Sequence, residues 1–136
     1  MLAWLLLVFI IPTAGAATLT VNTLDDTDVD DNWCTLREAI TAANNNADHQ
    51  GCTGTNYGDD TIRFDVSGGS GTISLGSTLP DITDPAGLTI DGTGQAITIS
   101  GNNSVRVMSI ASDAKLTLEQ MTVANGNSQN GGAIHS

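Results

Sequence analysis

Five carboxylates lie within the seven residues 25–31 of this chain: Asp25, Asp26, Asp28, Asp30 and Asp31. Three of them, Asp26, Asp28 and Asp30, have the alternating spacing of the first half of a calcium loop. The sixth position of such a loop is Asp31 instead of Gly, and the twelfth is Arg37 instead of Glu. The segment therefore predicts either a looser calcium site at Asp26, Asp28 and Asp30 or a solvated acidic loop without metal.

A second group of residues has the types that polysaccharide lyases and hydrolases use. Such sites need paired carboxylates on a groove, or calcium-binding aspartates with a basic residue that abstracts a proton. The carboxylates are Asp81, Asp84 and Asp91, and the basic residues are Arg63, Arg106 and Lys115. All three aspartates lie in turn sequences, "LPDITDP" and "DGTG", and turn formation explains them without chemistry. We therefore assign no catalytic residue.

The composition of the chain limits the partners and the kind of fold that can be expected. The 136 residues allow one domain, and 15 Asp and Glu against four Lys and Arg give a net charge of −11. This charge argues against nucleic acid and anionic lipid as partners, because both require a basic face. Aromatic residues make up 4% of the chain, so a core has to be built from aliphatic side chains. Abundant Gly, Asn and Thr favour short strands and tight turns.

The first residues, "MLAWLLLVFIIPTAGAA", have the pattern of a secretory signal. An apolar run from Leu2 to Ile11 is followed by Pro12 and by small residues that suit cleavage after Ala16. The run is short for a bilayer span, although a retained N-terminal anchor is the alternative. We predict a signal peptide over residues 1–16 and an exported mature chain that begins near Ala17.

Export sets the expected state of the two cysteines, Cys34 and Cys52. An even pair in an exported chain tends to oxidise, and a loop of this length would stabilise the fold by about 3 kcal/mol in the chain-entropy model. A metal site that includes His49 is the alternative, but two thiolates and one imidazole are fewer ligands than such a site needs. We predict the disulfide.

The stretch "CTLREAITAANNN" predicts a helix of about ten residues. Thr35 and Glu38 fit a capping box, in which each side chain bonds the backbone N–H of the other residue. An apolar stripe follows at helical spacing: Leu36, Ala39, Ile40 and Ala43. Such a short helix is unstable alone, so its stripe has to lie against other elements. We assign residues 17–60 to an N-terminal cap region that contains this helix.

Short segments with period-two alternation make up most of the remainder. They are Thr18–Leu24, Thr61–Val66, Thr72–Leu75, Leu88–Ile90, Ile97–Ser100, Val107–Ile110, Leu116–Leu118 and Met121–Val123. Several of the turns between them match tight-hairpin signals, which makes an antiparallel β-sandwich one possible fold.

An internal repeat favours a different architecture. Leu88–Ile90 recurs 28 positions later as Leu116–Leu118, and Ile97–Ile99 recurs 24 positions later as Met121–Val123. A period in the twenties, with short strands in each unit, is typical of a solenoid whose coils stack in parallel. We therefore predict an all-β parallel β-helix over residues 61–136, with the helix covering its first coil and the antiparallel sandwich as the alternative.

The helix stretch resembles the Cys-Ser-Leu-Arg-Glu-Ala motif found near the N-terminus of many exported bacterial proteins with right-handed parallel β-helix repeats. Thr35 stands where Ser is usual and keeps the capping hydroxyl. Residues 131–134, Gly-Gly-Ala-Ile, resemble an element of polymorphic outer-membrane protein repeats. The likeness extends over nearly all of the mature chain.

This resemblance implies a right-handed β-helix in a secreted or outer-membrane surface protein, with further repeats or an anchor beyond residue 136. It implies a non-catalytic structural stalk or adhesin-type module, with glycans or other cell-surface molecules as partners. Because parallel β-helices also host enzymes, a fragment of a carbohydrate-active enzyme is the alternative function. Apart from the calcium considered above, no cofactor is expected.

Overall fold

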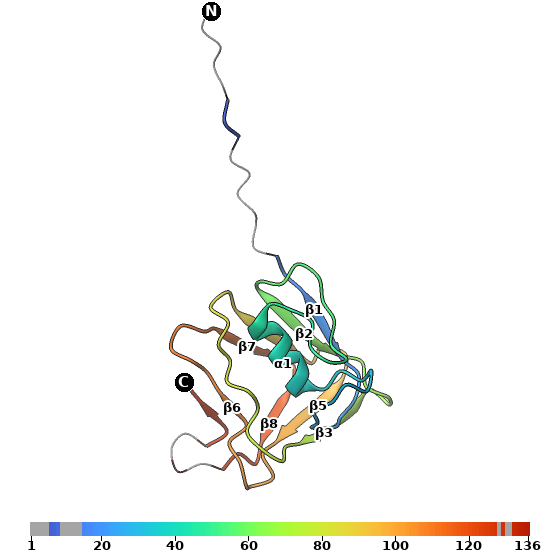
Figure 1. Ribbon diagram of the computed structural model, residues 1–136. Coiled ribbons are helices and arrows are strands. Elements are labelled where there is room, and N and C mark those ends of the chain that lie inside the picture. The colour runs from blue at the N-terminus through green and yellow to red at the C-terminus, as the bar shows by residue number, and fades with distance from the viewer. Residues whose placement is uncertain (1–5, 9–14, 128, 130–131) are drawn as a thin grey trace, which may run out of the picture.

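The computed structural model describes residues 6–8, 15–127, 129 and 132–136 (Figure 1). The predicted signal peptide, residues 1–16, lies outside the described residues except for 6–8 and 15–16. Among the helices in these described ranges, none has the length and apolar character needed to cross a membrane.

The described residues form one helix and nine short strands. In chain order they are β1 (Thr18–Val21), α1 (Leu36–Asn45), β2 (Asp60–Phe64), β3 (Ser70–Ser74), β4 (Leu88–Asp91), β5 (Ala96–Ser100), β6 (Met108–Ser109), β7 (Leu116–Glu119), β8 (Thr122–Ala124) and β9 (Ile134–His135). The strands make three sheets, with the orders β1-β2-β4-β7, β3-β5-β8 and β6-β9.

Every pair of neighbouring strands in these sheets is parallel. Leu88 pairs with Leu116 and Ile90 with Leu118, which confirms the predicted stacking of the first repeated triplet. In the second triplet Ile99 pairs with Val123, as the repeat also predicts. Equivalent residues therefore lie directly beside one another, and their apolar side chains form columns that are buried at β4 and β5 and partly buried at β7 and β8.

The alternative expectation, an antiparallel sandwich, is wrong. The single antiparallel bridge within the described residues joins His49 to Cys52, outside the sheets. The Gly-rich and Asn-rich turns do not fold the chain back as hairpins. The turn after Asp91, for example, leads from β4 into β5 of a different sheet.

Turn residues stack along with the strands. The side-chain amide of Asn102 donates to the carbonyl of Leu75 at 3.1 Å, and that of Asn127 donates to the carbonyl of Asn103 at 2.8 Å. Gly92 is required for close packing, because a Cβ there would collide with the carbonyl oxygen of Gln120. Successive turns are therefore held at the same spacing as successive strands.

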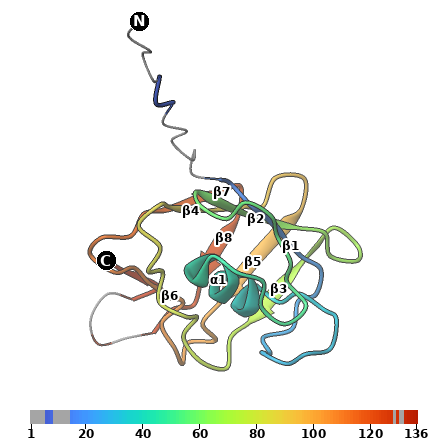
Figure 2. The ribbon, with the colours of Figure 1, turned by 45° about the horizontal axis from the view of Figure 1, so that its top comes forward.

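Helix α1 begins and ends as the sequence predicts. Thr35 and Glu38 form the capping box, and Asn46 ends the helix in the left-handed region at φ 50°. The apolar residues of α1, including Leu36 and Ile40, are fully buried in the same core as the strand residues. In both views α1 lies across the space that the three sheets surround (Figure 2). The helix therefore covers one end of the apolar interior.

The third sheet was predicted only in part, because the predicted segment Val107–Ile110 contains its strand β6. No strand was expected in "GGAIHS", yet Ile134 pairs with Met108 to form β6-β9. Gly131 of the Gly-Gly-Ala-Ile element lies outside the described residues. A parallel bridge joins Ile82 to Ile110, the residue that directly follows β6.

Candidate functional site

Asp26 of the acidic loop is engaged by Arg37 at the start of α1. The guanidinium donates from Nε to Oδ1 and from Nη2 to Oδ2, each at 2.9 Å. The same guanidinium donates to the backbone carbonyls of Ser77 and Thr78, also at 2.9 Å. Arg37 therefore ties the acidic loop and the helix to the connection that follows β3.

The other carboxylates of the loop do not converge on Asp26. Asp28 Oδ1 lies 2.8 Å from His49 Nε2, and Asp31 accepts a hydrogen bond from the backbone N–H of Trp33. Across the described ranges no group of three or more His, Cys, Asp or Glu side chains is placed to hold a metal ion. The structure places Asp26 against Arg37 and Asp28 against His49. The calcium site at Asp26, Asp28 and Asp30 stays a prediction.

The predicted disulfide is present between Cys34 and Cys52, whose Cα atoms are 4.7 Å apart. The bond joins the residue just before the helix cap to the loop that returns from α1. The alternative metal site, in which both thiolates would join His49, is therefore wrong. His49 pairs with Asp28 instead.

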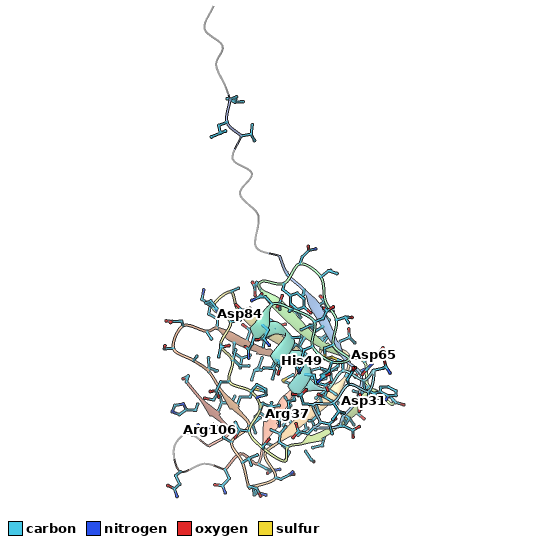
Figure 3. The ribbon with its side chains drawn as sticks, viewed as in Figure 1. Asp31, Arg37, His49, Asp65, Asp84 and Arg106 are labelled. Carbon is cyan, nitrogen blue, oxygen red and sulfur yellow. A yellow bond between two sulfur atoms is a disulfide. The ribbon has the colours of Figure 1, made fainter. Side chains whose placement is uncertain are left out.

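Two of the three aspartates considered for catalysis, Asp84 and Asp91, serve turns, and the backbone carbonyl of Asp81 accepts a hydrogen bond from the side-chain amide of Asn44. Asp84 accepts a hydrogen bond from the backbone N–H of Ala86, and Asp91 accepts one from that of Thr93. Hydrogen bonds from Thr93, together with the nearby Arg63, hold the pKa of Asp91 below its ordinary value. Figure 3 shows Asp84 and Arg106 well away from the acidic loop that contains Asp31. These positions agree with the turn-forming role expected from the sequence.

A buried carboxylate that sequence reasoning missed lies at the start of β2. Asp60 is fully buried, and its Oδ1 accepts hydrogen bonds from the backbone N–H groups of Ala17 at 2.8 Å and Gly58 at 2.9 Å. Its other oxygen, like one oxygen of the buried Asp84, has no hydrogen-bond partner in the described part of the chain. Burial raises the pKa of Asp60, and the negative charges of Asp84 and Asp59 raise it further.

Replacing Asp60 with Asn is expected to stabilise the protein at neutral pH. The raised pKa means that the folded state binds the proton of Asp60 more tightly than the unfolded state does. The contribution of Asp60 to the free energy of unfolding is therefore most favourable at pH values below its ordinary pKa of 3.8. This contribution is lost as the pH rises through the raised pKa of the folded state. Asp60→Asn keeps an acceptor for Ala17 and Gly58 without the buried charge.

The measurement is denaturant unfolding of wild type and Asp60→Asn between acid and neutral pH. The advantage of the variant should grow as pH rises. Asp60→Ala is the matched control, because it removes the charge and the acceptor together and should cost about 1.5–3 kcal/mol. Equal pH dependence in wild type and Asp60→Asn would contradict the assignment.

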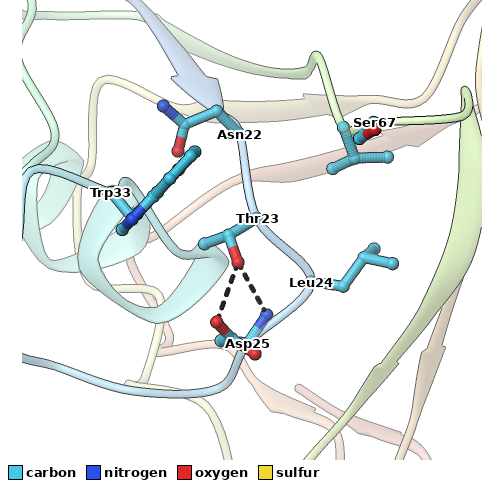
Figure 4. A pocket seen from close by; sticks show the side chains of 7 residues that line it. Asn22, Thr23, Leu24, Asp25, Trp33 and Ser67 are labelled. Atoms are coloured by element: carbon cyan, nitrogen blue, oxygen red, sulfur yellow. Dashed lines mark hydrogen bonds between the residues drawn. The ribbon is translucent and has the colours of Figure 1, made fainter.

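A pocket of about 490 Å³ opens beside the acidic loop (Figure 4). It is lined by Asn22, Thr23, Leu24, Asp25, Trp33, Val66 and Ser67. These residues come from the segment that follows β1, from the position before Cys34 and from the segment that follows β2. Trp33 is 54% exposed, whereas Val66 is buried. The pocket therefore combines an exposed aromatic wall with a polar rim.

The backbone around this pocket is firmly held. Asn22 and Cys34 exchange two hydrogen bonds, from Cys34 N to Asn22 Oδ1 at 2.8 Å and from Asn22 N to Cys34 O at 3.1 Å. Gly51, beside the disulfide, lies so close to the carbonyl of Trp33 that a Cβ there would collide with it. On the rim the Thr23 hydroxyl donates to Asp25 Oδ2 at 3.0 Å.

Of the residues that line the pocket, sequence reasoning singled out Asp25, as part of the acidic run, but not Trp33 or the pocket itself. A usable signal exists, because Trp33 lies directly before Cys34 in an acidic segment of a chain whose aromatic content is 4%. The burial of Asp60 could also have been predicted, because Asp60 is in phase along β2 with the inward-facing Ile62 and Phe64. A carboxylate in phase with apolar strand residues is expected to be buried.

Comparison of this chain with protein-family models, with curated proteins and with solved structures found no match. The resemblance to exported proteins with the Cys-Ser-Leu-Arg-Glu-Ala motif therefore stays a prediction. Function has to follow from the residues and their geometry.

Proposed function

We propose that this chain is the helix-capped N-terminal portion of a right-handed parallel β-helix in a secreted or cell-surface protein. Its role is non-catalytic, as a structural stalk or adhesin-type binding module. The observation that carries the proposal is the in-register parallel pairing of successive strands in each sheet.

The path of the chain supports a coiled arrangement. After α1 the chain enters β2 of the first sheet, then β3 of the second, and then passes Ile82, which bridges to Ile110. It returns to the first sheet at β4, continues through β5 to β6, and repeats this order through β7, β8 and β9. Each circuit therefore lies against the previous one, as in a solenoid.

The helix α1 and the disulfide support the proposal that this end is the first coil of such a stack. The end of a solenoid has open strand edges and exposed core side chains, which proteins usually cover. Helix α1 buries Leu36, Ala39 and Ile40 against this interior, and the Cys34–Cys52 bond holds both of its flanks. The disulfide and the signal-like N-terminus also favour an exported location.

The test combines location with turnover. In the source cells the tagged full chain should be found outside the cytoplasm, and N-terminal sequencing should show a mature chain that begins near Ala17. Incubated with a panel of polysaccharides, the purified protein should release no reducing ends. Intracellular retention would contradict the surface role, and product formation would favour the carbohydrate-active enzyme alternative.

A further inference from the structure

We propose that the Trp33 pocket is a binding site for a neutral saccharide. A sugar ring would stack on the Trp33 indole, and its hydroxyls would bond the polar side chains of the rim. The proposal deepens the binding role proposed above, but it depends on the local geometry of the pocket and requires neither the β-helix nor a surface location.

The exposed indole is the first argument. Most large apolar side chains in the described part of the chain, such as those of Ile62 and Leu36, are fully buried, whereas Trp33 is 54% exposed. Exposed Trp is typical of interfaces, because its rings offer a large apolar face and its N–H can reach a polar partner. A sugar ring has a face of C–H groups that suits an aromatic plane, and hydroxyls around its edge.

The polar rim is the second argument. Figure 4 shows the Thr23 hydroxyl and the Asp25 carboxylate together on one side of the pocket and Ser67 across from them. Asn22 adds an amide beside Trp33, and the Oδ1 of this amide already accepts a hydrogen bond from the backbone N–H of Cys34. Hydroxyl, amide and carboxylate groups are the donors and acceptors that sugar hydroxyls need. A few convergent polar groups on an apolar wall are the usual composition of small-molecule sites.

Rigidity and size are the third argument. The two hydrogen bonds between Asn22 and Cys34, one backbone–side chain and one backbone–backbone, fix the segment that carries Trp33, together with the adjacent disulfide. A pre-formed site lowers the entropic cost of binding. Its volume of about 490 Å³ lies within the range of roughly 300–1,000 Å³ that is usual for small-molecule sites.

Charge selects the kind of saccharide. The chain carries a net charge of −11, and Asp25 contributes a carboxylate to the rim, so acidic sugars and phosphates are repelled. A Lys or Arg side chain could also stack on an indole. Neutral hydroxyl and amide groups nevertheless outnumber the single carboxylate of the rim, which already accepts a hydrogen bond from Thr23. A neutral, hydroxyl-rich ligand therefore fits best.

Tryptophan fluorescence makes a direct test, because the chain has two tryptophans and Trp33 is the only one outside the predicted signal peptide. In the full chain with Trp4→Phe, emission would report on Trp33 alone. Titration with a panel of neutral oligosaccharides should give a saturable change in emission for at least one of them, at micromolar to millimolar concentration. Calorimetry should give the same affinity without relying on the fluorophore.

Variants locate the site. Trp33→Ala should weaken calorimetric binding by more than about tenfold, because a stacking aromatic anchor is lost. Trp33→Phe should retain part of the affinity. Val29→Ala is the matched control, since Val29 is an exposed apolar residue of the same loop that does not line the pocket, and it should bind as wild type does. Circular dichroism would check that each variant is folded.

Three outcomes would overturn the proposal: no neutral oligosaccharide binds at millimolar concentration, binding survives Trp33→Ala unchanged, or only an oligolysine or oligoarginine peptide shifts the emission. The last result would assign the pocket to cationic side chains. Each outcome is independent of the location and turnover tests. Failure of the saccharide site would therefore not decide the proposed surface role, which those two tests measure separately.

Discussion

Arg37→Met should lower the free energy of unfolding by about 3–5 kcal/mol. The side chains of Arg37 and Asp26 are only 14% and 9% exposed, and they form a two-pronged ion pair. Removing the guanidinium leaves the Asp26 carboxylate buried without its cation and removes two bonds to the carbonyls of Ser77 and Thr78. Denaturant unfolding at neutral pH would measure the loss.

Two further variants separate charge from geometry. Arg37→Lys keeps the charge but loses the two-pronged bond, so its loss should lie between wild type and Arg37→Met. Asp26→Asn added to Arg37→Met should restore part of the stability, because no uncompensated charge is then buried. A loss below about 1 kcal/mol for Arg37→Met would mean that the pair behaves as an exposed surface salt bridge.

Replacing both Cys34 and Cys52 with Ala should cost about 3 kcal/mol, within the range of about 2–5 that is usual for disulfides in small exported domains. The bond closes a loop of separation 18 that contains the whole of α1. A helix of ten residues is marginal on its own, so release of its flanks should also loosen the covered end of the core.

Thermal unfolding with and without a reductant provides the control. Reductant should lower the midpoint of the wild type toward that of Cys34→Ala/Cys52→Ala and leave the variant unchanged. Should the variant melt with the wild type, the cap would be held by its packing and by Arg37 rather than by the covalent bond.

Local features of this fold could be predicted from the sequence because their causes are local. The capping box at Thr35 and Glu38, the apolar stripe of α1 and the turn at Asn46 all lie within a dozen residues. The parallel pairing of β4 with β7 could be predicted because the triplet repeats itself. Repetition makes a long-range contact visible in the sequence.

Other features depend on contacts that no local pattern reveals. Two of the acceptors of Arg37 lie 40 and 41 positions away, where no local pattern could point to them. Strand β6 lies within the predicted segment Val107–Ile110, but its partner β9 has only two residues, too few for a period to appear. The Trp33 pocket assembles segments that follow different strands, so its lining is a product of the tertiary fold.

The order of the strands in each sheet bears on the order in which the sheets can form during synthesis. In each sheet of the described residues, a strand pairs with the one that precedes it on the same side of the molecule: β2 joins β1, β4 joins β2, and β7 joins β4. Helix α1 contacts β1 and β2, the earliest strands of the chain. Each strand that follows another in its sheet therefore pairs with one that precedes it in the chain, whereas α1 and Arg37 also contact later segments, β2 and the carbonyls of Ser77 and Thr78. The sheets can therefore form in the order in which a chain delivered from its N-terminus arrives, one residue after another.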